Sequence, residues 1–147
     1  MPVFHKILVP IDGSHTADKA LDHALRIAKD NHAKVRLLHC IDELSLINSH
    51  EYTGELWQQA RDNGQDLLRR GEALAKAHGV DVDTRLIDQV GQRLGQSVAD
   101  AAGDFGADLV VVGTHGRRGI GRVLLGSGSE QIMRLSPVPV LMVRGFD

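Results

Sequence analysis

Cysteine is almost absent from this chain of 147 residues, and Cys40 is the only one. A single cysteine excludes an intramolecular disulfide and a cysteine-rich zinc site. Long hydrophobic runs are missing as well, since no stretch approaches the ~18 apolar residues of a membrane-spanning helix. The first residues, MPVFHKILVPIDGS, lack the charged region and apolar core of a signal peptide. We therefore expect a cytoplasmic protein with no membrane insertion.

Aromatic residues and charge of one sign are also scarce. Aromatics make up 3% of the chain, too few to flank the ring of a flavin. The 17 Lys and Arg residues nearly balance the 19 Asp and Glu residues, which gives a formal net charge of -2. Nucleic-acid binders carry a basic field, so no nucleic-acid partner is expected. The length fits one domain, which we assign to residues 1–147.

Short β-rich runs alternate with longer segments of helical periodicity, which favours an α/β fold with a parallel sheet. Nearly continuous apolar strands are typical of a sheet that helices cover on both faces. Strands are expected at 6–9, 35–40, 83–87, 109–113 and 138–143. Helices are expected around 17–28, 51–78, 94–105 and 127–135, with a surface loop at 42–50. The pattern predicts a doubly wound, five-stranded sheet, in which ligands bind where the strand order reverses.

Glycines cluster after the fourth predicted strand, where six of the sixteen lie between Gly113 and Gly128. Glycine lets a ligand approach main-chain N–H groups without a Cβ in the way. The loop GTHGRRGIGRVLLGSGSEQ leads from a strand into a helix, and the start of a helix favours a phosphate. Three arginines, Arg117 among them, add local positive charge, although by themselves they favour a solvated patch over ligand contacts. We interpret the loop as a phosphate-binding loop, with a ligand-free surface turn as the alternative.

Other known nucleotide and nucleophile motifs do not fit. The chain has no Walker-type G-x-x-x-x-G-K-[ST], no G-x-G-x-x-G after the first strand and no G-x-S-x-G elbow. Ser127 with Glu130 three residues later is a candidate capping box, which is compatible with a hydroxyl that also meets an oxyanion. Asp12 is a candidate for ribose or cation binding, with an Asx turn or a helix N-cap as the alternative. We expect Cys40 to be a small buried hydrophobe, and His39 to be a packed or hydrogen-bonded strand residue.

The glycine spacing resembles that of a known family. Gly113-x-x-Gly116, nine residues and then Gly126-Ser127 match the G-x2-G-x9-G-[ST] signature of the universal stress protein family. KILVPIDGS, LLHCID, DLVVVGTHG and SPVPVLMVR agree with that family in order, over essentially the full length. The resemblance implies an adenine nucleotide alpha hydrolase-like sheet of strand order 3-2-1-4-5. It also implies membership of the branch that carries the glycine signature and binds ATP.

The resemblance assigns a role to each matching position. Pro10 and Asp12 would contact the nucleoside, and Cys40 and Ile41 would line the adenine pocket. The glycine loop would hold the ribose and phosphates, although Gly128 stands where the family usually has a larger residue. The residues expected to bind ATP are Pro10, Asp12, Cys40, Ile41, Gly113, Gly116, Arg117, Gly126, Ser127, Gly128 and Ser129. ADP, AMP and a cyclic or dinucleotide relative suit the same pocket, and the need for Mg2+ stays open.

The last predicted strand, SPVPVLMV, is apolar on both faces and contains Pro139. Proline cannot donate to a sheet ladder, so this should be an edge strand. An exposed apolar edge favours pairing with a second copy about a two-fold axis, and the resemblance implies the same dimer. The residues expected in that interface are Val138, Val140 and Met142; an edge covered by the chain's own helix is the alternative.

These features predict an ATP-binding regulatory homodimer of the stress response. Efficient hydrolysis is not supported, because no Walker lysine, arginine finger or water-positioning glutamine is evident. At most we expect slow hydrolysis or phosphate transfer to a serine. A receiver-type phospho-acceptor domain needs a second acidic residue beside Asp12 and a lysine after the fifth strand, and neither is present. A dimeric scaffold that regulates a partner protein remains the alternative.

Overall fold

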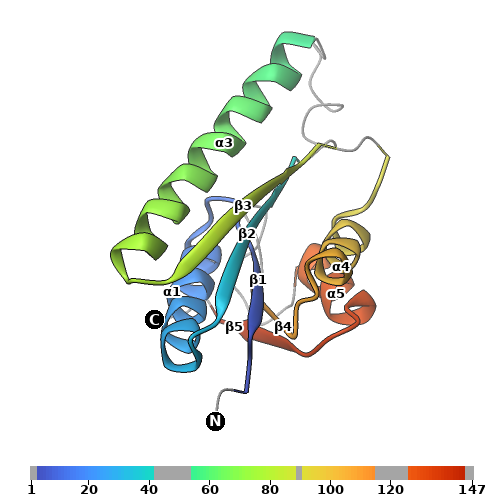
Figure 1. Cartoon of the computed structure of the whole chain (residues 1–147). Coiled ribbons are helices and arrows are strands. Elements are labelled where there is room, and N and C mark those ends of the chain that lie inside the picture. The colour runs from blue at the N-terminus through green and yellow to red at the C-terminus, as the bar shows by residue number, and fades with distance from the viewer. Residues whose placement is uncertain (1–2, 42–53, 89–90, 115–125, 145–147) are drawn as a thin grey trace.

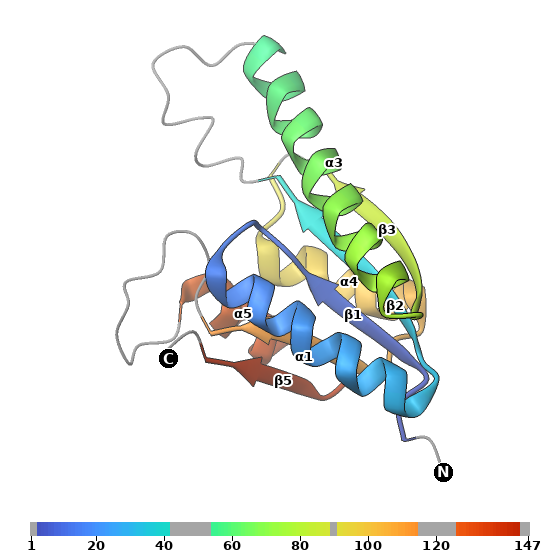
Figure 2. The ribbon, with the colours of Figure 1, turned by 90° about the vertical axis from the view of Figure 1, so that its left-hand side faces the viewer.

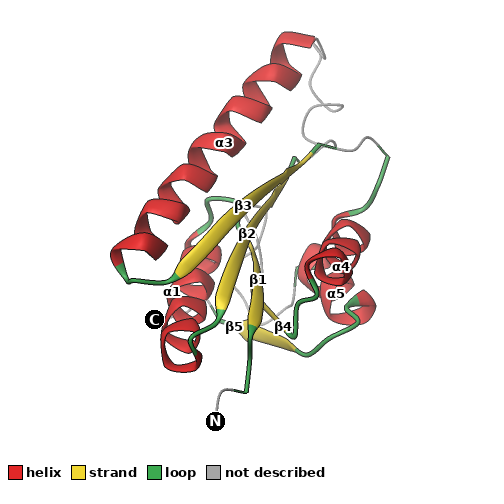
Figure 3. Cartoon of the chain, viewed as in Figure 1, coloured by secondary structure: helices red, strands yellow, loops and turns green. Residues whose placement is uncertain are grey.

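The structure is a computed structural model that describes residues 3–41, 54–88, 91–114 and 126–144. Figure 3 shows strands and helices alternating along the chain. The strands are β1 (Lys6–Pro10), β2 (Lys34–Cys40), β3 (Asp81–Ile87), β4 (Leu109–Gly113) and β5 (Val140–Val143). The helices are α1 (His15–Asn31), α3 (Gly54–Ala77), α4 (Leu94–Phe105) and α5 (Ser127–Leu135). The loop predicted at 42–50 and the predicted start of the long helix at Glu51 lie outside the described residues.

The five strands form one parallel sheet in the order β3-β2-β1-β4-β5, which confirms the predicted fold (Figure 1). β1 pairs with β2 from Lys6↔Lys34 onwards and with β4 at Ile7↔Leu109. The chain first adds strands on one side of β1 and then crosses to the other side for β4 and β5. The strand order therefore reverses between β1 and β4, and their carboxyl ends meet at the same edge of the sheet.

The sheet separates two hydrophobic cores, because its strands bury side chains on both faces. α1 and α3 lie on one face, while α4 and α5 lie on the other (Figure 2). On the first face, Leu25 and Leu68 pack against Val35 and its neighbours. On the second face, Val98 and Ile132 pack against Leu8 and its neighbours. The alternation along β1 therefore distributes Ile7 and Leu8 to opposite cores.

Two glycines in α3 allow this helix to lie close to the sheet. A Cβ added to Gly64 would lie 2.6 Å from Cδ2 of His39, and one added to Gly71 would lie 2.7 Å from Cδ1 of Leu37. Both distances are too short for carbon atoms in contact, so a larger residue would displace these side chains or α3 itself. In Figures 1 and 2 the first turns of α3 extend beyond the carboxyl ends of β2 and β3.

Two predicted strand starts are wrong. β3 begins at Asp81, two residues earlier than predicted, and pairs with β2 along its whole length. β5 begins at Val140 rather than Val138. The Ser136 hydroxyl donates to the Val138 carbonyl at 2.8 Å, and the Val138 N–H points to the same hydroxyl oxygen at 3.2 Å. This local turn withdraws Val138 from the sheet ladder, and pairing with β4 begins at the Pro139 carbonyl, which accepts from the Val110 N–H at 3.0 Å.

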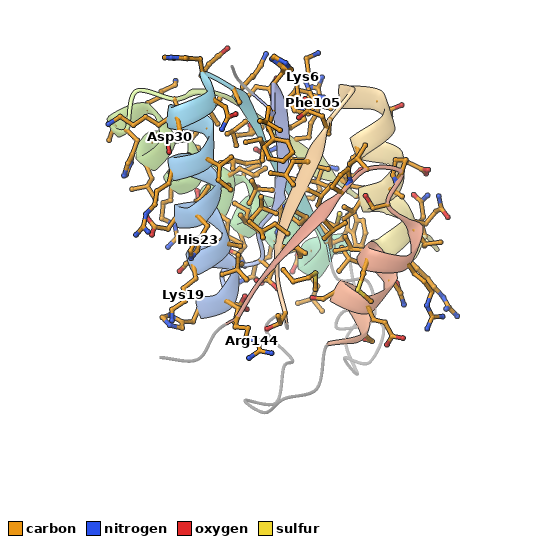
Figure 4. All side chains as sticks on the ribbon, turned by 90° about the horizontal axis from the view of Figure 1, so that it is seen from below. Lys6, Lys19, His23, Asp30, Phe105 and Arg144 are labelled. Carbon is orange, nitrogen blue, oxygen red and sulfur yellow. The ribbon has the colours of Figure 1, made fainter. Side chains whose placement is uncertain are left out.

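A charged cluster occupies the sheet near the amino ends of the strands. Arg36 forms a two-pronged contact with Asp83 on the neighbouring strand, through hydrogen bonds of 2.8 and 2.9 Å. The Arg36 guanidinium also lies 4.2 Å from the centre of the Phe105 ring. Nζ of Lys6 lies 5.4 Å from the centre of the same ring, and Figure 4 labels Lys6 and Phe105. The hydrogen bond from Arg36 is the main reason that the pKa of Asp83 is lowered. This cluster ties β2 and β3 to the end of α4.

Replacing Asp83 with asparagine should change how stability depends on pH. A carboxylate whose pKa is lower in the folded state stabilises the fold above its unfolded pKa of about 3.9, and the gain disappears as the pH falls below that value. We expect Asp83→Asn to cost about 1 kcal/mol at pH 7, because the pair is partly exposed. Urea unfolding from pH 7 to 3 should show a smaller loss of stability in the variant than in the parent. Parallel curves would contradict the assignment.

Among the described residues, no helix has the length and apolar character that crossing a bilayer requires.

Candidate functional site

The carboxyl edge between β1 and β4 brings together the loop after β1 and the start of α1. The Ile11 N–H donates to the Leu38 carbonyl at 2.7 Å, so the chain stays against β2 for one residue beyond β1. α1 then begins above β4, where a Cβ added to Gly113 would lie 2.8 Å from Cβ of Thr16. The first turn of α1 therefore lies directly against the carboxyl end of β4.

Asp12 lies between β1 and α1, at the predicted reversal of strand order. Its Oδ1 accepts a hydrogen bond of 2.9 Å from the Ser14 N–H, so the Asx turn considered from the sequence does form. Asp12 is not the helix cap, because the Ser14 hydroxyl oxygen accepts from the Ala17 N–H at 3.2 Å. The carboxylate of Asp12 is thus held in a defined direction at the edge where a ligand of this fold class binds.

α5 begins at the same edge, after the glycine-rich loop. The Gly126 N–H donates to the Thr114 carbonyl at 2.8 Å, which brings the two ends of the loop together. The capping-box hypothesis is wrong: Gly126 is the N-cap and offers no side chain, while Ser127 is the first residue of the helix. Helix geometry leaves the N–H groups of Ser127, Gly128 and Ser129 without partners inside α5. These amides, with the positive end of the helix dipole, suit an anion.

Three of the predicted loop residues have structural contacts of their own. The Ser129 hydroxyl is buried and donates to the Gly113 carbonyl at 2.6 Å, which ties α5 to the end of β4. A Cβ added to Gly128 would lie 2.7 Å from Cδ2 of Leu94, so this glycine lets α5 lie close to the start of α4. Gly113 is needed for the close approach of Thr16. Close helix packing therefore accounts for Gly113 and Gly128 without a ligand.

β2 ends with His39 and Cys40 beside the loop that follows β1, and Ile41 is the next residue. The Ile41 N–H donates to the Ile87 carbonyl at 3.0 Å. Cys40 is half-buried, not fully buried as expected. Desolvation raises the pKa of its thiol to about 12, so the thiol is protonated at neutral pH, which agrees with the expected small hydrophobe. Nδ1 of His39 lies 2.8 Å from the Ile11 carbonyl oxygen, which confirms the prediction of a hydrogen-bonded strand residue.

A series of contacts connects most of the predicted site. Pro10 pairs with Leu38 on β2 and is followed in the chain by Ile11 and Asp12. The first turn of α1 then contacts the end of β4, where Thr16 lies against Gly113. Gly113 in turn contacts Ser129 on α5. Gly116 and Arg117 lie outside the described residues. Two residues of this edge were not predicted. Ser14 could have been recognised, because a serine just before a helical segment is typical of an N-cap. Thr16 could not, because its partner Gly113 is distant in sequence.

A separate hollow of about 420 Å³ lies between α4 and α5, where Arg93, Gln96 and Gln131 are among its lining residues. It contains none of the predicted site residues. No group of three or more His, Cys, Asp and Glu side chains placed to share a metal ion occurs within residues 3–41, 54–88, 91–114 and 126–144.

The five-stranded parallel sheet of order 3-2-1-4-5 places this protein in the class with the adenine nucleotide alpha hydrolase-like fold. The model of the universal stress protein family matches residues 4–144, and this chain belongs to that family. A universal stress protein homologue from Staphylococcus haemolyticus is 33% identical over 145 residues, covering 98% of this chain and 87% of its own.

Solved structures agree with this assignment. The hypothetical protein MJ0577 superposes with a TM-score of 0.84 at 28% identity, covering 97% of both chains. A universal stress protein in complex with cAMP has a TM-score of 0.69 at 26% identity, covering 97% of this chain and 98% of its own. A universal stress protein from Archaeoglobus fulgidus in complex with dAMP shares the fold, with a TM-score of 0.71 at 18% identity over 96% of this chain and 98% of its own.

Proposed function

We propose that this chain binds ATP at the carboxyl edge between β1 and β4 and acts as a homodimeric regulatory protein of the stress response. The observation that carries the proposal is that α5, whose first N–H groups have no side-chain cap, begins at the same edge of the sheet as the Asp12 turn, where the strand order reverses. The relatives in complex with cAMP and dAMP support an adenine nucleotide as the ligand class.

Each part of the nucleotide finds suitable chemistry among the described residues. Anionic phosphates suit the N–H groups of Ser127, Gly128 and Ser129, because these donors and the helix dipole act together. The Asp12 carboxylate can accept hydrogen bonds from ribose hydroxyls, or serve as one oxygen ligand of a Mg2+ ion that accompanies the phosphates. The apolar ends of β1 and β2, with Pro10, Cys40 and Ile41, suit the flat faces of adenine.

Ligand-linked stabilisation tests the proposed function. A ligand at 100 times its Kd stabilises the folded state by about 2.7 kcal/mol, which corresponds to a rise in Tm of about 5–10 °C for a chain of this size. We expect Mg-ATP to raise the Tm more than Mg-GTP, which has a different base, and more than tripolyphosphate, which has none. No rise at millimolar ATP would contradict the proposal and favour the scaffold function.

We also propose that β5 pairs with β5 of a second copy. β5 is an edge of the sheet, and Leu141 on it is 38% exposed. Three side chains near this edge are partly buried against the core on the second face of the sheet: Val138, Val140 and Met142. In a dimer they would also pack against the second copy. Pairing two such edges about a two-fold axis satisfies the open N–H and C=O groups of both strands.

Replacing Leu141 with arginine should weaken this dimer. Pairing of the two edges would bring the two arginines of the dimer onto neighbouring strands, where they repel each other. A cost of about 1.4 kcal/mol already raises the dissociation constant tenfold. Sedimentation equilibrium should show at least that change for Leu141→Arg. Leu74→Arg on α3, where the leucine is 43% exposed and distant from β5, is the matched control and should leave the dimer unchanged. A dimer insensitive to Leu141→Arg would place the interface elsewhere.

A further inference from the structure

Ile11, the first residue beyond β1, is held by β2 through both of its backbone polar groups. Its N–H donates to the Leu38 carbonyl at 2.7 Å. Its carbonyl oxygen lies 2.8 Å from Nδ1 of His39. A carbonyl oxygen can only accept, so Nδ1 carries the hydrogen and donates it. The β1–α1 loop therefore begins from a fixed residue.

The hydrogen bond from His39 also determines where the next residue points. The Ile11 carbonyl and the Asp12 nitrogen belong to one planar peptide group, so holding the carbonyl fixes the plane from which Asp12 starts. Oδ1 of Asp12 then accepts from the Ser14 N–H at 2.9 Å, and Ser14 caps α1. Hydrogen bonds on both sides of Asp12 in the chain thus contribute to the direction of its carboxylate.

α3 holds the His39 ring in place from the other side. The ring is so close to the α3 backbone that a Cβ on Gly64 would lie 2.6 Å from Cδ2 and 3.2 Å from Nε2 of His39. One turn further along α3, the Leu67 side chain reaches the loop itself, where a Cβ on Gly13 would lie 3.2 Å from it. Gly13 has a φ of +81°, a conformation that other residues rarely adopt. α3 therefore supports both the histidine and the loop that the histidine holds.

We infer that His39 is a positioning residue for the nucleotide site: it sets the Ile11–Asp12 peptide plane, and α3 at Gly64 holds the ring in the orientation that does so. The inference rests on the proposed nucleotide function. If His39 only filled space, the fold would need no hydrogen-bond donor at the position of Nδ1. Asparagine offers a donor close to the position of Nδ1, whereas leucine fills similar space and has none.

ATP affinity across a set of variants tests the role in binding. Loss of one hydrogen bond that orients a ligand group should raise the Kd for ATP about tenfold in His39→Leu. His39→Asn should stay within about threefold of the parent, since its amide can donate to the same carbonyl. Gly64→Ala should raise the Kd about fivefold by displacing the ring. Gly103→Ala is the matched control, because a Cβ there meets nothing within 4 Å, and its Kd should not change.

Amide hydrogen exchange without nucleotide separates this inference from the proposed function. In His39→Leu the Ser14 amide, which donates to Asp12, should exchange about tenfold faster, whereas the Val110 amide in the sheet should keep its rate. His39→Asn should restore slow exchange at Ser14. If the parent binds no nucleotide, the proposed function fails, and the Ser14 exchange rates alone decide whether His39 sets the loop. Equal Kd and equal exchange in His39→Leu and the parent would overturn the inference.

Discussion

Adding one methyl group at Gly113 should destabilise the protein more than any other glycine substitution considered above. A Cβ at this position would lie 2.8 Å from both Cβ and Oγ1 of Thr16 and 2.9 Å from its backbone carbon. The backbone of α1 cannot rotate away as a flexible side chain can, so either α1 or β4 must move. Overpacking of this kind costs about 3 kcal/mol, which lowers the Tm of a chain of this size by about 6–12 °C.

Urea and thermal unfolding of Gly113→Ala measure this cost directly. Gly103→Ala in α4 makes the same chemical change in open space, where alanine should instead stabilise the helix by about 0.5–1 kcal/mol. The two variants should therefore shift the unfolding midpoint in opposite directions. A Gly113→Ala protein as stable as the parent would mean that α1 does not lie against β4 as described.

The second large effect is expected on nucleotide binding from Ser127→Pro. Proline is tolerated at the first position of a helix, and Gly126 before it has ψ 152°, the extended conformation that a following proline requires. The fold should therefore persist while one N–H of the proposed phosphate site is lost. A hydrogen bond to a charged group contributes about 1.5–3 kcal/mol, so the Kd for ATP should rise about 10- to 150-fold.

Ser127→Ala is the control for this variant, because it removes the hydroxyl and keeps the amide. Titration calorimetry should show a much smaller loss of affinity for Ser127→Ala than for Ser127→Pro, with equal unfolding midpoints for both. Equal affinities of Ser127→Pro and the parent would show that the first amide of α5 does not contact the nucleotide.

The sequence predicted the architecture well because hydrophobic burial determines it. Strands such as 109–113 are continuous apolar runs, and every residue of β4 is buried. The boundaries were less accurate where a single side chain decides them. Ser136 removes Val138 from the ladder. For α5 the predicted range 127–135 is confirmed, and only the cap was wrong, because it is Gly126 and not Ser127. Local hydrogen bonds of this kind compete with the sheet and helix hydrogen bonds, and the pattern of apolar residues does not reveal them.

The candidate site was likewise predicted well where the signal is local and poorly where it depends on distant segments. The glycine spacing located the loop between β4 and α5, because that signal lies within one short segment. The reason for Gly113 could not be predicted, since Thr16 is almost a hundred residues away in sequence. His39 was correctly interpreted as a hydrogen-bonded strand residue, but its acceptor, Ile11, and its support, Gly64, come from two other parts of the chain. Contacts between segments that are distant in sequence could be identified only from the fold.

We propose above all that an adenine nucleotide binds at the carboxyl edge of the sheet, where both the start of α5 and the Asp12 turn lie. The most direct test follows backbone amide shifts by NMR while the 15N-labelled protein is titrated with Mg-ATP. The account predicts that the largest shifts occur at Ser127, Gly128, Ser129 and Asp12, and that they saturate together. Unchanged amides at these four residues, or shifts centred on Lys6 and Lys34 at the opposite edge of the sheet, would contradict it.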